Sequence, residues 1–145
     1  MARDPGIRPD PPAAAVAAVV DAARRSFELI LVDIGRTGEG LATLAWDCDR
    51  ILLLAKANLK SAVAATRVLS ELPPIDTGLL VRGTIATSVD ATLIADSLGL
   101  PLLGVLPEMR GVAAGTELGR LLELGRRKSI SRLAGSVLEL NGAIQ

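Results

Sequence analysis

Residues 50–81, RILLLAKANLKSAVAATRVLSELPPIDTGLLV, decide the fold that the sequence predicts. This stretch begins and ends with short apolar runs, at 50–54 and 77–81, each of the length of one strand. A helical pattern lies between them, and the proline pair at 73–74 ends it. Strand, helix and strand in this order predict two parallel strands joined by a crossover helix.

The same alternation continues on both sides of this stretch. Two more apolar runs are typical of buried strands: residues 27–32 (FELILV) and 101–106 (PLLGVL). Strands without polar alternation, separated by helices, indicate an α/β fold with a parallel sheet covered by helices on both faces. Helices are expected over 13–25, about 39–46, from a cap at Asn58 or Ser61 to about Leu72, 89–98 ending at Gly99, 112–124 and 129–140.

The ends of the chain differ in character. Residues 1–12 contain four prolines and predict a flexible lead-in, whereas 13–145 are expected to form a single α/β domain. The last helix has a narrow apolar stripe, so it is expected to pack on the sheet. The basic residues 126–128 in front of it also fit a membrane-surface element, and we expect such contact to be weak at most. Trp46 and Cys48 are expected in or near the core.

Composition excludes several classes of function. The 145 residues include 16 basic and 16 acidic side chains, no histidine and one cysteine. Ser-His-Asp catalysis, imidazole metal sites and thiolate zinc clusters are therefore excluded, and a neutral chain has no electrostatic signal for nucleic acid. The mean hydropathy of +0.43 is high, but no apolar run reaches the length of a membrane span. We expect a cytoplasmic protein.

Candidate functional residues follow the predicted strands, because ligands of open α/β sheets bind at the carboxyl ends of strands. Asp33 follows the run at 27–32 and could hold Mg²⁺ beside a phosphate, accept a phosphoryl group, or simply cap the next turn. Lys56 follows the second strand as a phosphate-binding or merely solvated cation. Arg82 follows the third strand, and residues 107–111 follow the fourth.

The glycine-rich turn after Asp33 is not a complete phosphate loop. Gly35 and Gly40 have the required spacing, but Leu41 and Ala42 occupy the positions of the lysine and the hydroxyl residue. A switch or turn is the better interpretation. A phosphoacceptor receiver domain is a weaker alternative, since the residues before Asp33 predict a helix where a receiver requires an earlier strand.

Three segments together resemble the C-terminal half of a MinD/ParA-type P-loop ATPase, closest to the CpaE/TadZ branch and the actinobacterial septum site-determining proteins. They are FELILVDIGR (27–36), AWDCDRILLLAKANLKSAVAATRVL (45–69) and LGLPLLGVLPEMRGVAAGTELGRLL (98–122), and the final RRKSISRLAGSVLEL resembles the closing helix of that family. The resemblance covers nearly all of residues 13–140. It implies a partial P-loop NTPase fold that lacks the Walker A strand, loop and helix.

The resemblance also implies roles for individual residues. Asp33 would be the Walker B-type acid near Mg²⁺, hence both the catalytic and the metal residue. The other implied residues would contact the nucleotide: Gly35, Arg36 and Gly38 as the switch region, Arg82 near the base-reading position, and Pro107, Glu108 and Met109 beside the adenine. Arg82 departs from the asparagine that many relatives use there.

The family implies ATP and Mg²⁺ as cofactors of the complete domain, with none expected for this chain alone. Residues 1–26 contain no GK[ST] loop, so hydrolysis of ATP by this chain alone is not expected. The implied function is septum-site determination or localisation of pilus or secretion machinery, through nucleotide-dependent dimerisation and recruitment of partner proteins at the pole, septum or inner membrane face. The alternative is a non-catalytic interaction module of the same fold. The expected partners are an N-terminal P-loop half or a second copy.

Overall fold

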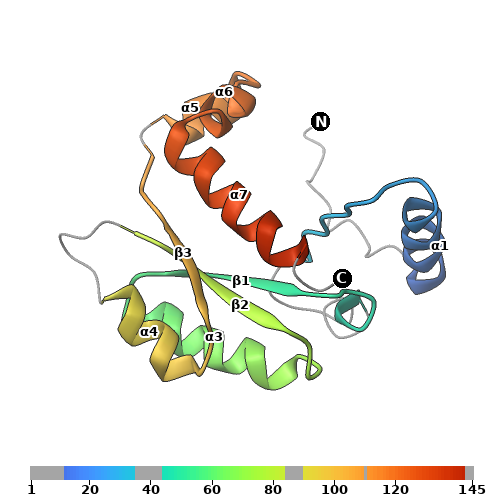
Figure 1. Ribbon diagram of the computed structural model, residues 1–145, viewed down its shortest axis with the longest axis horizontal. Helices are drawn as coiled ribbons and strands as arrows, with labels where there is room; N and C mark the ends of the chain where they lie inside the picture. Colours follow the sequence, from blue (N-terminus) through green and yellow to red (C-terminus); the bar gives the residue numbers. More distant parts are fainter. Residues whose placement is uncertain (1–11, 35–43, 84–89, 110, 143–145) are drawn as a thin grey trace, which may run out of the picture. The chain divides into compact units, whose positions relative to one another are not determined.

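A computed structural model describes residues 12–34, 44–83, 90–109 and 111–142 (Figure 1). The chain divides into two compact units, Met1–Leu44 and Ala45–Gln145. The first contains helix α1; the second contains a parallel sheet and the remaining helices. The elements are α1 Ala13–Arg24, β1 Ile51–Lys56, α3 Leu59–Glu71, β2 Thr77–Arg82, α4 Ala91–Leu98, β3 Leu102–Leu106, α5 Val112–Glu117, α6 Leu121–Gly125 and α7 Lys128–Gly142.

In the first unit, α1 confirms the helix expected at 13–25. Pro12 occupies the N-cap position, and the helix has no side-chain cap. Residues 27–34 have no regular secondary structure, so the strand predicted at 27–32 is wrong. Phe27 and Leu31 are 67% and 79% exposed, because a β-prone run becomes a strand only where another strand supplies hydrogen-bond partners. Residues 1–11 of the lead-in predicted at 1–12, and most of the helix predicted at 39–46, lie outside the described residues.

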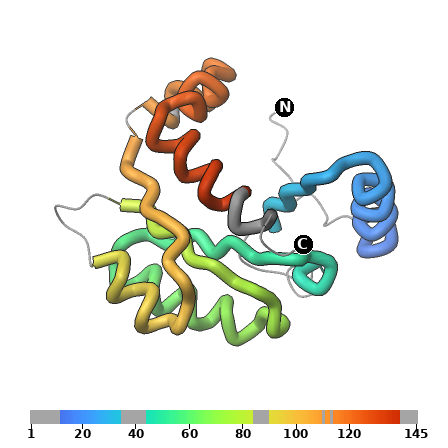
Figure 2. Tube along the Cα trace, viewed as in Figure 1, coloured from blue at the N-terminus to red at the C-terminus, as the bar shows by residue number. Residues whose placement is uncertain are grey.

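The second unit confirms the α/β prediction. Its sheet has three parallel strands in the order β1-β2-β3, which is also their order in the chain. Helices α3 and α4, the two crossovers, lie on one face, as crossovers of one hand require in a sequential sheet (Figure 2). Helix α7 packs on the other face, where its Leu133 meets Gly104 of β3. The sheet is therefore flanked by helices on both faces.

The core lies between the sheet and the α3/α4 layer. Leu79 and Val81 of β2 and Ile94 of α4 are its largest fully buried side chains. They pack with Ala55 of β1 and Ala95 of α4. Small residues at Ala55 and Ala95 allow the helices to approach the strands closely. Alternate residues of β2 therefore supply the side chains that hold this layer together.

Local signals explain where the helices begin and end. Asn58 caps α3 by accepting a hydrogen bond at 2.8 Å from the Ser61 N–H, as one of the two predicted caps. Gly99 ends α4 in the left-handed conformation that glycine favours. The single helix expected at 112–124 is two short ones, because Gly119, with φ of 67°, breaks the chain between them. Trp46, expected in or near the core, directly follows the helical residues 44–45 and is 68% exposed.

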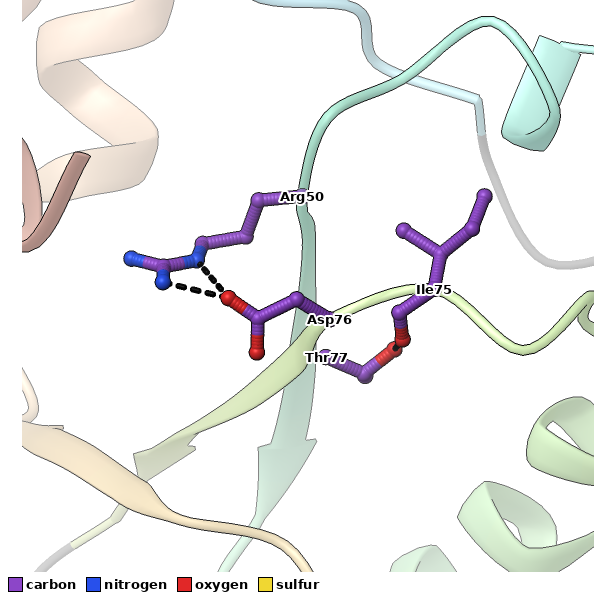
Figure 3. A network of polar contacts seen from close by, with 4 residues as sticks. All are labelled: Arg50, Ile75, Asp76 and Thr77. Atoms are coloured by element: carbon purple, nitrogen blue, oxygen red, sulfur yellow. Dashed lines mark hydrogen bonds and ion pairs between the residues drawn. The ribbon is translucent and has the colours of Figure 1, made fainter. Parts of the chain in front are cut away.

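An ion pair ties the start of β1 to the start of β2 (Figure 3). The Nε of Arg50 donates to the Oδ2 of Asp76 at 2.7 Å, and a second guanidinium nitrogen contacts the same oxygen. The Ile51 N–H also donates to the Asp76 carbonyl at 2.9 Å. Residues far apart in the sequence are thereby joined directly before the first register pair of the two strands, Ile51 and Thr77.

Candidate functional site

The carboxyl edge of the sheet brings together three of the segments that the sequence singled out. Lys56 ends β1 and is paired in register with Arg82, which ends β2. Arg82 is paired in turn with Leu106 at the end of β3, directly before Pro107. Because the strands are parallel, their carboxyl ends all lie at one edge of the sheet, which is the usual location of ligands in open α/β sheets.

Backbone hydrogen bonds hold this edge in register. The Ala57 N–H donates to the Arg82 carbonyl at 2.8 Å, and the Gly83 N–H donates to the Leu106 carbonyl at 3.2 Å. The chain then turns at Asn58 into α3. The backbone hydrogen-bond ladder therefore continues one residue beyond β1 and β2. These hydrogen bonds hold the backbone at Lys56 and Arg82 in place.

The charges at this edge suit an anion. Lys56 and Arg82 are both exposed, and their paired positions place them on the same face of neighbouring strands. An ammonium beside a guanidinium complements phosphate oxygens, with the planar guanidinium able to donate two parallel hydrogen bonds. Glu108 is exposed beyond β3 and Met109 is half-buried. The residues present fit a phosphate group better than a neutral ligand.

The other predicted site residues, Asp33 and those that follow it, belong to the first unit. Asp33 is exposed and lies within the irregular stretch 27–34 that replaces the predicted strand. Gly35, Arg36 and Gly38 lie outside the described residues. Within the described ranges, no three carboxylate or thiol side chains gather to hold a metal ion. The role of Asp33 beside Mg²⁺ therefore stays a prediction.

The edge of β1 is a feature that the sequence analysis missed. Leu52 and Leu54 are 38% and 57% exposed, although the run at 50–54 predicts a strand buried on both faces. Alternation along β1 explains the difference, since Leu53 and Ala55 pack in the α3/α4 layer and leave Leu52 and Leu54 on the opposite face. In the part of the chain that the structure describes, β1 pairs with β2 alone.

The lengths and composition of the helices show whether any of them could span a membrane. Within the described residues, no helix is both long enough and apolar enough to cross a bilayer.

Sequence comparisons identify two relatives, both from Mycobacterium tuberculosis. Uncharacterized protein Rv3660c of strain ATCC 25618 / H37Rv is 31% identical over 126 residues, which is 85% of this chain and 36% of the relative. Uncharacterized protein MT3760 of strain CDC 1551 / Oshkosh matches with the same identity and coverage. The chain thus spans about a third of the length of these relatives. No family model matches the chain.

Proposed function

We propose that this chain is the C-terminal part of a MinD/ParA-type P-loop ATPase domain of the CpaE/TadZ or septum site-determining kind. In the complete domain it would bind ATP with Mg²⁺, dimerise according to the nucleotide state, and recruit proteins of the division, pilus or secretion machinery. This chain by itself would not hydrolyse ATP, since the phosphate-binding loop would come from another segment.

The observation that carries the proposal is the register at the carboxyl edge. Lys56 and Arg82 are paired at the ends of adjacent strands, and Arg82 pairs with Leu106, the residue before Pro107. The resemblance assigns Arg82 to a place near the base-reading position and Pro107 to a place beside the adenine. Three parallel strands in sequential order are the geometry in which both segments would border one ligand.

The exposed leucines of β1 support the proposal that another strand pairs with the free edge of β1 in the complete domain. A strand from a P-loop half, paired along the edge of β1 that is opposite β2, would satisfy the backbone groups of that edge, and its side chains on the same face would contact Leu52 and Leu54. The loop of such a half would bind the phosphates and so would bring them to the carboxyl edge. Lys56 would then lie between that loop and Arg82.

Calorimetric titration with ATP and Mg²⁺ tests the proposal on two samples: this chain, and this chain preceded by the P-loop half of a MinD/ParA-type ATPase. We expect binding only in the second. There, Arg82→Ala should weaken binding by about tenfold, because a charged hydrogen-bond donor is lost. Arg67→Ala is the matched control, since Arg67 is exposed on α3 and paired with Glu71. Asp33→Ala should abolish turnover.

The alternative is a non-catalytic interaction module of the same fold. It predicts that the folded fusion binds no ATP and that Asp33→Ala changes nothing measurable. That result would contradict the ATPase proposal.

A further inference from the structure

A short apolar segment of the first unit lies without a strand to pair with. Residues 27–34 have no regular secondary structure, and the side chains of Phe27, Leu29 and Leu31 are exposed. The backbone of residues 28–34 makes no hydrogen bond to any other residue that the structure describes. The segment therefore combines β-prone side chains with backbone groups that no described residue satisfies.

The open edge of β1 offers the complementary half of a strand pairing. The N–H groups of Ile51 and Ala57 donate to carbonyls beside the start and at the end of β2. Because successive N–H groups of a strand point to opposite sides, those of Leu52, Leu54 and Lys56 point away from β2. In the described ranges, β1 has β2 as its single neighbouring strand. Every second residue of β1 is thus ready to pair with a further strand.

One antiparallel register of residues 28–32 on β1 matches both charge and apolar character. Its facing residues are one pair of opposite charge and two aliphatic pairs: Glu28 with Lys56, Ile30 with Leu54, and Val32 with Leu52. Facing pairs of both kinds stabilise a sheet. Neither Glu28 nor Lys56 forms an ion pair with another described residue. A parallel alignment of the same residues would instead place the glutamate opposite Leu52.

We propose that residues 28–32 of one copy of this chain add to the open edge of β1 in a second copy, as an antiparallel strand in this register. Within one chain the structure leaves both the segment and the edge unpaired, so a second copy supplies what each lacks. In this register the N–H and C=O groups of residues 28, 30 and 32 face β1. Two copies that exchange their segments satisfy both edges at once and close as a dimer.

The exchange does not depend on the proposed ATPase role. It concerns the chain alone, whereas the P-loop half of the proposed function would pair along the same edge of β1 in the complete domain. A fusion that binds no ATP therefore leaves the exchange untouched. The experiments below use the full chain without any added half.

Two proline variants test the strand pairing. Sedimentation equilibrium of the unchanged chain should show monomer and dimer in exchange. Ile30→Pro should raise the dissociation constant of the dimer by roughly tenfold or more, because the N–H group that faces β1 is lost. Leu29→Pro is the matched control: the N–H group of residue 29 faces away from β1, so the constant should change by less than about threefold. Far-UV circular dichroism verifies that each variant is folded.

Charge reversal tests the register. Glu28→Lys and Lys56→Glu each place like charges opposite each other at both ends of the dimer, so each should raise the dissociation constant by roughly tenfold. The double variant restores opposite charges and should dimerise about as the unchanged chain does. Arg67→Glu makes the same change of charge at an exposed position of α3 and should leave the constant unaltered.

Cross-linking of mixed copies separates exchange from pairing inside one chain. One copy carries Val32→Cys and the other Leu52→Cys, both in a Cys48→Ser background. Mild oxidation should join them, because facing residues of antiparallel strands lie within the reach of a disulfide. Ile30→Cys mixed with Leu52→Cys is two residues out of register, so it should cross-link roughly tenfold more slowly.

Four results would overturn the proposal. They are a monomer at all concentrations, equal effects of the two proline variants, no recovery in the double charge variant, and equal cross-linking in the two cysteine mixtures. Growth of the assembly beyond a dimer would contradict the closed exchange.

Discussion

Gly104 of β3 lies directly against Leu133 of α7: a Cβ atom at Gly104 would be 2.2 Å from the Leu133 Cδ1. The contact depends on the absence of a side chain at position 104. The packing of α7 therefore rests on one glycine that the apolar pattern of 101–106 does not distinguish.

Gly104→Ala should lower the free energy of unfolding by about 1–3 kcal/mol, because the added methyl displaces Leu133. Urea unfolding followed by circular dichroism measures this change. Adding Leu133→Ala should remove most of the penalty of the alanine, and a double-mutant cycle reports the coupling. Gly135→Ala in α7 is the control, since a Cβ there meets nothing within 4 Å; it should be neutral or stabilising.

Leu79→Ala should destabilise the second unit most among simple truncations. Leu79 is fully buried on the central strand and packs with the α4 residues of the core. Loss of its side chain leaves a cavity and should lower the free energy of unfolding by about 2–5 kcal/mol. Leu93→Ala, on the exposed side of α4 at 62% exposure, should change it by less than about 1 kcal/mol. Equal effects of the two variants would contradict the described core.

Asp76→Asn should weaken the link between the starts of β1 and β2. The Arg50 side chain is 15% exposed and the Asp76 side chain 49%, so the pair is partly screened by solvent. We expect a loss of about 1 kcal/mol at low salt and less at high salt. Chemical unfolding at two ionic strengths measures this. Glu71→Gln, which removes the exposed pair with Arg67, should have an effect near zero and no salt dependence.

The open edge of β1 predicts self-association of this chain. Leu52 and Leu54 are exposed beside backbone groups that, within the described residues, have no neighbouring strand on that side. Light scattering should therefore show an apparent mass that rises with concentration. Leu54→Lys should reduce that rise, because a charge on an edge strand opposes pairing. A clean monomer at high concentration, or an unchanged rise in the lysine variant, would count against this edge as the interface.

Most of the second unit was predictable from local pattern. The proline pair at 73–74, the cap at Asn58 and the glycine at Gly99 are local signals, and the structure has helix ends at each. The carboxyl edge was also predictable, since three strands that are parallel must end on the same side. Arg82 and Pro107 were placed on that edge from sequence, and the register confirms the placement of both.

The first unit was less predictable. Residues 27–32 and 50–54 have nearly the same apolar character, yet only the second became a strand. The two runs differ in their tertiary contacts. Strand β1 pairs with β2 and packs against α3, whereas residues 27–34 have no strand pairing. Trp46 shows the same limit, because an aromatic side chain is buried only where the tertiary structure provides a surface against it.

The sequence by itself determined the order of the strands in the second unit, the cap at Asn58, the helix end at Gly99, and the set of residues at the strand ends. These features depend on interactions within a few residues, which composition and spacing encode. Only the tertiary structure decided which apolar runs are strands and which leucines are covered. Those outcomes depend on partners distant in the chain: β2 for β1, and the sheet for α7. Leu54 and Leu122 are exposed because, within the described residues, no such partner covers their side chains.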